Sequence, residues 1–279
     1  MSEIINSAIN YHAYNMRTDD SLISQVSKII CVLFPRGLSV AGFNAEGELL
    51  VIRYGDYNKT LPAWIHDFYE HRFTDEPLLA NPEKVVATFI ASDKNMLVPQ
   101  TLFDDLESEK WMNKIFFVEG NEVVTTDKII GEHAKYMFAY PGTVKSIIAR
   151  HFSNSRLLPI AAYQFEKPIE TPHKLAAIIT PENVYATLYK DQILHWHQAF
   201  YYEHGEDIAY QLKLACQQHS INENDLAIRV SVAYRGLNPV LNNLSQYFPT
   251  INANEERLAN SGDWAATISL FQQLYSCVL

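Results

Sequence analysis

The feature that most constrains this chain is an order of strands and helices that occurs twice along it. In the first half, the apolar runs 40–43 and 49–54 predict a strand hairpin, followed by a helix and the buried strand VVATFIAS. In the second half, three apolar runs within residues 174–202 predict a strand meander, followed by a long amphipathic helix and another strand. No residue-level repeat connects the halves, so the shared order predicts a duplication at the level of the fold.

A segment with two prolines and mixed charge separates the halves. EKPIETPHK, residues 166–174, is the predicted boundary, and it divides an α/β chain of mixed sheets into halves 37–168 and 169–279. Residues 1–36 are expected to form a polar leader that could add an edge strand. Two α/β halves side by side leave a cleft between them, which is a common place for a ligand.

Composition narrows the classes of function. The chain has 279 residues, of which 48% are hydrophobic, enough to build one large domain or two smaller ones. Its formal charge is −10, from 32 acidic residues against 22 Lys and Arg. Nucleic-acid binding draws most of its affinity from basic groups on phosphates, so the sequence disfavours a nucleic-acid partner.

Cysteine spacing and the apolar runs indicate a cytoplasmic protein. Cys31, Cys216 and Cys277 are far apart and form no CxxC pair, which is typical of a reducing compartment. The start MSEIINSAINYHAY lacks the basic and apolar regions of a secretion signal. The run IICVLF is far shorter than the ~20 residues that a membrane helix needs, so no membrane span is expected.

Three stretches, in this order, resemble successive blocks of one protein family. They are LVPQTLFDDLESEKWM after the strand VVATFIAS, then YMFAYPGTVKSIIARHF, then FYYEHGEDIAYQLKLACQQHSI. The likeness covers about residues 37–250 and is to an uncharacterised bacterial family found largely in the Bacteroidetes group. The resemblance implies an actin-like ATPase fold with two ribonuclease-H-like halves, akin to pilus-assembly and cell-division ATPase relatives.

The same resemblance implies where a nucleotide would bind. Active actin-like ATPases carry an Asp, a Gly and a Ser or Thr at the first hairpin of each half. The acids hold Mg²⁺, and the small residues let backbone N–H groups reach phosphates. In the first half, the predicted turn has Gly42 and Asn44 but no Asp. In the second half, the turn in IITPENVY has Thr180 and Asn183, while Pro181 lacks an N–H.

Four residues are the candidates for cleft-facing, cofactor-binding positions: Gly42, Asn44, Thr180 and Asn183. The resemblance implies that turns 41–47 and 180–183 face each other across the cleft. Glu46 and Glu182 add negative charge there, and Gly262 stands alone where a glycine-rich adenosine loop would be. Because both turns lack phosphate-binding chemistry, ATP with Mg²⁺ is disfavoured, no cofactor is assigned and no catalytic residue is named.

The histidines of HWHQAFYYEHGED are the other candidate site. On a strand, His195 and His197 point to one face, a geometry that metals use, and His204, Glu203 or Glu206 could complete the ligands. The alternative interpretation is a polar-faced edge strand before a helix start, because two histidines without a fixed third ligand are a weak signal. No metal is therefore assigned.

Three further patterns have a structural interpretation beside a functional one. The acidic run 104–109 suits catalytic carboxylates or the first turns of a solvated helix. Tyr201 and Tyr202 could stack a base or end a half-buried sheet. The apolar face of the final helix, from Trp264 to Val278, could dock a partner or pack on the protein's own core. In each case the structural interpretation is favoured.

The sequence leads to three hypotheses of function. The first is a cytoplasmic pseudo-ATPase of actin-like fold, without efficient ATPase activity, acting as a protein-interaction scaffold for an unidentified protein partner or a second copy of itself. The second is a nucleotide-binding ATPase or sugar-kinase-like enzyme with diverged phosphate loops, for which the strand-end acids Asp56, Asp93 and Asp191 are the candidates. The third is a metal-binding protein that uses His195 and His197.

Overall fold

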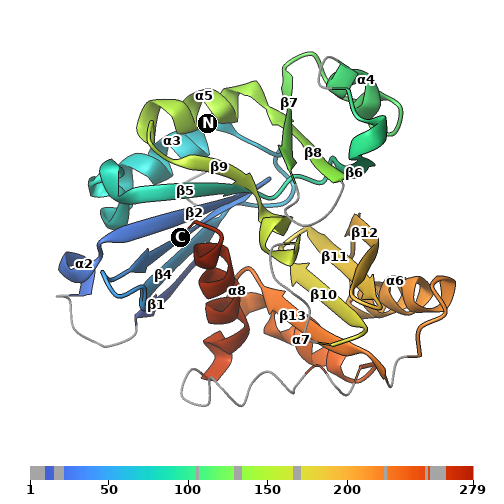
Figure 1. Cartoon of the computed structure of the whole chain (residues 1–279). Helices are drawn as coiled ribbons and strands as arrows, with labels where there is room; N and C mark the ends of the chain where they lie inside the picture. Colours follow the sequence, from blue (N-terminus) through green and yellow to red (C-terminus); the bar gives the residue numbers. More distant parts are fainter. Residues whose placement is uncertain are drawn as a thin grey trace.

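An antiparallel meander continued by parallel strands forms the first sheet. Its six strands run in the order β1-β4-β3-β2-β5-β9 (Figure 1). Neighbours are antiparallel from β1 to β2, whereas β5 pairs parallel with β2 and β9 parallel with β5. The strands are β1 Asn10–Asn15, β2 Lys28–Phe34, β3 Gly37–Phe43, β4 Leu49–Asp56, β5 Val85–Ile90 and β9 Arg156–Pro159.

The computed structural model describes residues 10–15, 22–104, 107–128, 134–165, 171–222, 225–248, 251 and 262–278.

Strand β2 lies in the middle of this sheet, which corrects one expectation from the sequence. The sequence assigns residues 28–34 to a polar leader, yet every residue of the strand after Lys28 is buried. The run IICVLF lacks the alternation of an edge strand because helices cover both faces of the sheet. Helices α3 (His66–Asp75) and α5 (Gly142–His151) lie on one face, and α8 (Ala265–Ser276) on the other (Figure 1).

Helices α3 and α5 pack against each other over the first sheet. Phe73 of α3 and Phe152 at the end of α5 meet edge to face, with ring centroids 4.7 Å apart. At the surface, Glu70 of α3 binds both Arg150 and His151 of α5. Short elements around these strands include helix α2 (Leu22–Gln25) and the 3₁₀ segments Pro77–Ala80, Pro82–Lys84 and Ile160–Phe165.

A small subdomain is inserted between β5 and α5. It has a three-stranded sheet in the order β6-β8-β7 and a core of its own around Met112 and Met137. The predicted strand YMFAY is confirmed within β8, but the helix predicted over LFDDLESEKWMNKIF is shorter, with Glu109 in its first turn. Asp105 of the acidic run lies outside the described residues. The elements are β6 Asn95–Pro99, α4 Ser108–Asn113, β7 Glu122–Lys128 and β8 Ala134–Pro141, with a 3₁₀ turn at Gln100–Leu102.

The second large sheet has four strands in the order β12-β11-β10-β13. The first three form the antiparallel meander that the sequence predicts, and β13 adds parallel to β10. Helix α6 has 14 residues and is amphipathic, as predicted. Among the described residues, no helix is long and apolar enough to cross a membrane. The elements are β10 Lys174–Ile179, β11 Asn183–Lys190, β12 Ile193–Tyr201, α6 Gly205–Gln218, β13 Ala227–Val232 and α7 Asn238–Ser245.

Helix α8 joins the two large sheets (Figure 1). Its residues Leu270, Phe271 and Leu274 are fully buried. Phe43 of β3 stacks on Tyr275 of α8, with ring centroids 4.1 Å apart and planes 10° from parallel, and the helix also contacts β13. The apolar face of the final helix therefore packs on the protein's own core.

The two large sheets share one strand order. Strands β4-β3-β2-β5 of the first correspond to β12-β11-β10-β13 of the second, so the order shared by the two halves of the sequence is present in the structure. We call each large sheet, with the helices on it, a lobe. The counterpart of the β10–β11 turn, residues 180–182, is thus the β2–β3 turn at Pro35 and Arg36. The boundary at 166–174 stays a prediction, and its residues 166–170 lie outside the described part.

Candidate functional site

The two corresponding turns meet across the cleft between the lobes. Arg36 Nη1 donates to Glu182 Oε1 at 2.6 Å, and these side chains are 22% and 12% exposed. Arg36 Nε also donates to the carbonyl of Leu61 at 2.8 Å. Lys59, in the segment after β4, donates from Nζ to the carbonyl of Pro181 at 3.0 Å. Two hydrogen-bonded cations of the first lobe, one from the β2–β3 turn and one from the segment after β4, therefore hold the β10–β11 turn.

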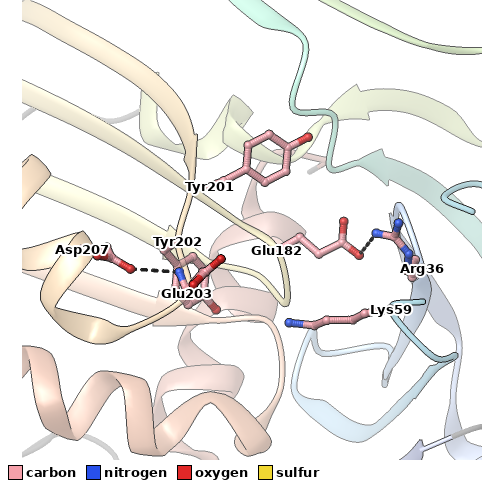
Figure 2. Close-up of a pocket in the computed structure, with 7 residues that line it drawn as sticks. All are labelled: Arg36, Lys59, Glu182, Tyr201, Tyr202, Glu203 and Asp207. Atoms are coloured by element: carbon pink, nitrogen blue, oxygen red, sulfur yellow. Dashed lines mark hydrogen bonds and ion pairs between the residues drawn. The ribbon is translucent and has the colours of Figure 1, made fainter. Parts of the chain in front are cut away.

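A cavity of about 450 Å³ opens beside this connection. Figure 2 shows its lining, which comes from both turns, from the segment after β4, from the end of β12 and from the start of α6. Asp207 Oδ2 accepts hydrogen bonds from the backbone N–H groups of Glu203, at 3.0 Å, and His204, at 2.9 Å. These bonds cap the start of α6 and hold that wall of the cavity in place. The lining residues are Arg36, Lys59, Glu182, Tyr201, Tyr202, Glu203 and Asp207.

Two tyrosines at the end of β12 are fixed by their hydroxyl groups. Tyr201 donates to Oδ2 of Asp93, which precedes the small subdomain, and Tyr202 donates to the carbonyl of Thr180 at 2.7 Å. A tyrosine hydroxyl is protonated at neutral pH, and burial at the hydroxyl ends of these two side chains raises their pKa further, so both are hydrogen-bond donors. The rings therefore have fixed positions at the cavity.

Aromatic rings fill the space between the lobes beside this cavity. Tyr54 of β4 stacks on Tyr234, which follows β13, with ring centroids 3.9 Å apart. His12 of β1 lies against Tyr234 at 5.0 Å, and the hydroxyl of Tyr54 donates to Asp56 Oδ2 at 2.9 Å. A Cβ at Gly236 would lie 2.2 Å from the Tyr234 ring, so this glycine permits the ring's position.

The candidates Gly42 and Asn44 lie at the other end of β3. A Cβ at Gly42 would come within 2.8 Å of Val26, so this glycine serves close packing. The amide of Asn44 binds the side chain and the backbone N–H of Glu48, which closes the β3–β4 turn. Seven residues of β3 separate that turn from Arg36, about 23 Å at ~3.3 Å per residue.

The expectation that turns 41–47 and 180–183 face each other is therefore wrong. Because β2 belongs to the sheet, the first hairpin of the first lobe lies one strand earlier, at Pro35 and Arg36. The sequence missed Arg36 and Lys59 for this reason. The available signal was the short interruption Pro35-Arg36 between the apolar runs IICVLF and GLSVAGF.

Thr180 and Asn183 lie next to the cavity and close the β10–β11 turn. Thr180 Oγ1 donates to the Asn183 carbonyl at 2.8 Å, and the Asn183 N–H donates to Thr180 Oγ1 at 3.1 Å. Both residues are buried, and both polar atoms of the Asn183 side chain lack a hydrogen-bond partner among the described residues. In this turn, Glu182 is the residue whose side chain binds the other lobe.

The histidines His195 and His197 do not share a face of β12. Thr187 pairs with His197 and Leu188 with Trp196, but Tyr189 pairs with Leu194, so His195 is the extra residue of a β-bulge. The bulge interrupts the alternation of side chains on which the predicted metal geometry depends. His195 packs on His219, with ring centroids 5.6 Å apart.

His197 instead takes part in a buried network between the second lobe and the small subdomain. Its Nδ1 lies 2.9 Å from Thr187 Oγ1, and its Nε2 lies 3.3 Å from Asn95 Oδ1. Its ring lies against those of Tyr136 and Phe165. Burial lowers the pKa of His197 to about 3, so the ring is neutral at physiological pH.

The strand-end acids that an ATPase would use do not converge. Asp56 accepts from Tyr54, and Asp93 accepts from Tyr201. Asp191 lies in the β11–β12 turn with φ of 52°. Within the described ranges, no group of three His, Cys, Asp or Glu side chains is placed to hold a metal ion.

Comparison with solved structures shows that the chain has the actin-like ATPase fold. It superimposes on a Bacteroides thetaiotaomicron VPI-5482 protein with actin-like ATPase fold and unknown function with a TM-score of 0.73 at 15% identity, covering 94% of this chain and 100% of that one. A chain of the PilM–PilN type IV pilus biogenesis complex gives a TM-score of 0.54 at 9% identity, covering 91% and 99%. At these identities the likeness shows the fold alone.

The sequence also matches a family model. Residues 18–251 match the family described as "Protein of unknown function (DUF3822)", and the chain belongs to this family. The resemblance carried by the three sequence blocks, to an uncharacterised bacterial family of actin-like fold, is thereby confirmed. A search of curated proteins found no match.

Proposed function

We propose that this chain is a protein-interaction scaffold built on the actin-like fold and lacks efficient ATPase activity. The observation that carries the proposal is the ion pair between Arg36 and Glu182, which joins the two turns that would have to hold a triphosphate. A phosphate group between these turns would have to separate the pair and displace a carboxylate.

The backbone of the β10–β11 turn supports the same conclusion. Pro181 has no N–H, and the N–H of Thr180 already donates to the carbonyl of Asn183 at 2.8 Å. Phosphate-binding turns work by presenting free backbone N–H groups to the ligand. The carboxylates of Glu182, Glu203 and Asp207 line the same cavity and would repel a nucleotide's phosphates.

The stacked rings of Tyr54 and Tyr234 support the scaffold in a second way. They join the lobes through an apolar contact, so the relative position of the lobes does not depend on a nucleotide. A chain of the same fold is part of the PilM–PilN complex, in which it is assembled with another protein. We infer a protein partner for this chain as well. Cys31, Cys216 and Cys277 are free and buried, which supports the reducing cytoplasm as its compartment.

The proposal is tested by ATP hydrolysis and thermal unfolding of the whole chain. We expect phosphate release at the level of a protein-free blank, and a Kd for Mg-ATP no better than about millimolar, roughly −4 kcal/mol. Tens of micromolar Mg-ATP should then leave the Tm unchanged. A ligand at a hundredfold excess over its Kd stabilises by about 2.7 kcal/mol, a shift of several degrees for a chain of this size.

A rise in Tm of that size, with turnover that Arg36→Ala or Lys59→Ala abolishes, would replace the scaffold by an enzyme with diverged phosphate loops. The variant Lys110→Ala is the matched control, because Lys110 is an exposed cation that pairs with Glu107 in the small subdomain.

A further inference from the structure

The cations that line the cavity between the lobes are already engaged by the protein. The guanidinium of Arg36 binds Glu182 and the Leu61 carbonyl, and the ammonium of Lys59 binds the Pro181 carbonyl. Both cations therefore hold the lobes together. An anion would compete with these bonds for the same donors.

On the wall opposite these cations, the carboxylates of Glu203 and Asp207 have oxygen atoms that can still accept hydrogen bonds. Glu203 is exposed, and its side chain forms no ion pair with any residue that the structure describes. Asp207 uses Oδ2 for the N–H groups of Glu203 and His204, and these bonds lower the pKa of Asp207. Three carboxylates line the cavity against two cations, so its charge balance favours an incoming cation.

An aromatic ring stands beside these carboxylates. Tyr201 is 65% exposed although its hydroxyl is fixed by Asp93, so its ring offers a face that does not have to be ordered on binding. A fixed tyrosine face next to carboxylates attracts a guanidinium more than an ammonium, because the planar guanidinium can stack on the ring and donate to a carboxylate at once.

A second observation on the same sheet face indicates unused hydrogen-bonding capacity. Asn183 pairs directly with Tyr201 in the register of β11 and β12, so the two side chains project from the same face. Both polar atoms of the Asn183 side chain are buried without a hydrogen-bond partner in the part of the chain that the structure describes. Buried polar groups usually have partners, and this exception lies next to the cavity lining.

We propose that this cavity receives the side chain of an arginine carried by a segment of a protein partner. The inference rests on the proposed function in that the partner is a protein. In this proposal Glu203 forms an ion pair with the guanidinium, and the ring of Tyr201 stacks on it. The Arg36–Glu182 pair limits how deeply the arginine side chain enters the cavity. The charge of −10 on the whole chain attracts a basic segment over longer range.

The probe for this proposal is N-acetyl-arginine methylamide, compared with its citrulline counterpart, which has the same shape and no charge. Amide chemical shifts of the isotope-labelled chain are followed as each compound is added. We expect saturable shifts at residues 201–207 with the arginine compound, and binding weaker by about tenfold or more with citrulline. Glu203→Gln should weaken the arginine compound by a similar factor, whereas Glu109→Gln, an exposed carboxylate on α4, should not.

Equal binding of the two compounds, or unchanged binding to Glu203→Gln, would overturn the proposal. So would shifts at residues 201–207 with inorganic pyrophosphate and none with the arginine compound. The proposed function is judged separately by ATP turnover. If neither Mg-ATP nor the arginine compound binds, the scaffold stands and the arginine site falls. If Mg-ATP is turned over, the scaffold falls whichever result the arginine compound gives.

Discussion

Tyr54 and Tyr234 stack face to face between the lobes, with ring centroids 3.9 Å apart and planes 3° from parallel. Tyr54 belongs to the first sheet and is fully buried, whereas Tyr234 follows the last strand of the second. Gly236 leaves room for the Tyr234 ring, which lies where a Cβ of residue 236 would be. This aromatic contact between the lobes therefore depends on a glycine two residues from Tyr234.

Gly236→Ala is expected to destabilise the protein by overpacking this stack. The added Cβ would lie 2.2 Å from the ring of Tyr234. The ring of Tyr234 also stacks on Tyr54, so it has little room to move away from the new methyl group. We expect the free energy of unfolding, measured in urea, to fall by about 1–3 kcal/mol. Gly120→Ala is the control, because nothing lies within 4 Å of a Cβ there. Equal effects of the two substitutions would contradict the assigned role of Gly236.

The Arg36–Glu182 pair is expected to couple the lobes energetically. A double-mutant cycle with Arg36→Ala and Glu182→Ala should give a coupling free energy of about 1–2 kcal/mol, because both side chains are mostly buried. The exposed pair Lys110–Glu107 should give a much smaller coupling free energy, and that coupling should be more sensitive to salt. Urea unfolding of the six variants and the wild type measures both couplings. If the two were indistinguishable, the bridge would contribute nothing to holding the lobes.

Stability should depend on pH through His197. Burial lowers its pKa from 6.5 to about 3, so between these values the unfolded chain binds a proton that the native chain excludes. The contribution of His197 is therefore fully present above pH 6.5 and is lost as pH falls towards 3. His197→Gln removes this proton uptake, so the advantage of the wild type should shrink by about 1 kcal/mol per pH unit below pH 6.

Urea unfolding of wild type and His197→Gln at pH 7, 6 and 5 is the measurement. His71→Gln, an exposed position of α3, is the control for a histidine without buried contacts. A difference between wild type and His197→Gln that stays constant with pH would show that the ring is not excluded from protonation.

Helix α8 is expected to be essential for stability because it packs between the two sheets. Phe271 is fully buried, and Phe271→Ala should lower the free energy of unfolding by about 3–5 kcal/mol. Its neighbour Gln272 is exposed, so Gln272→Ala should stay within about 0.5 kcal/mol of the wild type. A loss below about 1 kcal/mol for Phe271→Ala would mean that the helix can leave the core at little cost.

Local pattern sufficed for much of the fold. The meander of the second lobe, helix α6 and strand β5 follow from the spacing of apolar residues and from turn residues between the runs. Strand β2 shows where this reasoning stops. A continuous apolar run has no period, and its burial depends on helices α3, α5 and α8, which lie far away in the sequence.

The prediction of the candidate site depended on whether β2 is recognised as a strand of the sheet. The sequence predicts Thr180 and Asn183 as candidates because they flank the turn of the second lobe, and it places the opposing turn one strand too late. Arg36 and Glu182 are 146 residues apart, and nothing local to either indicates the other. The bulge at His195 likewise follows from how β12 pairs with β11, and it separates two histidines that a regular strand would place together.

The sequence by itself determined the family and most of the order of strands and helices, since both depend on residue types at short spacing. Only the tertiary structure decided which turns meet, which rings fill the cleft and which carboxylates stay unpaired. The physical reason is that side-chain contacts between the lobes follow from sheet register and helix packing. Both are set by the whole core, and a shift of one strand or one residue changes every contact across the cleft.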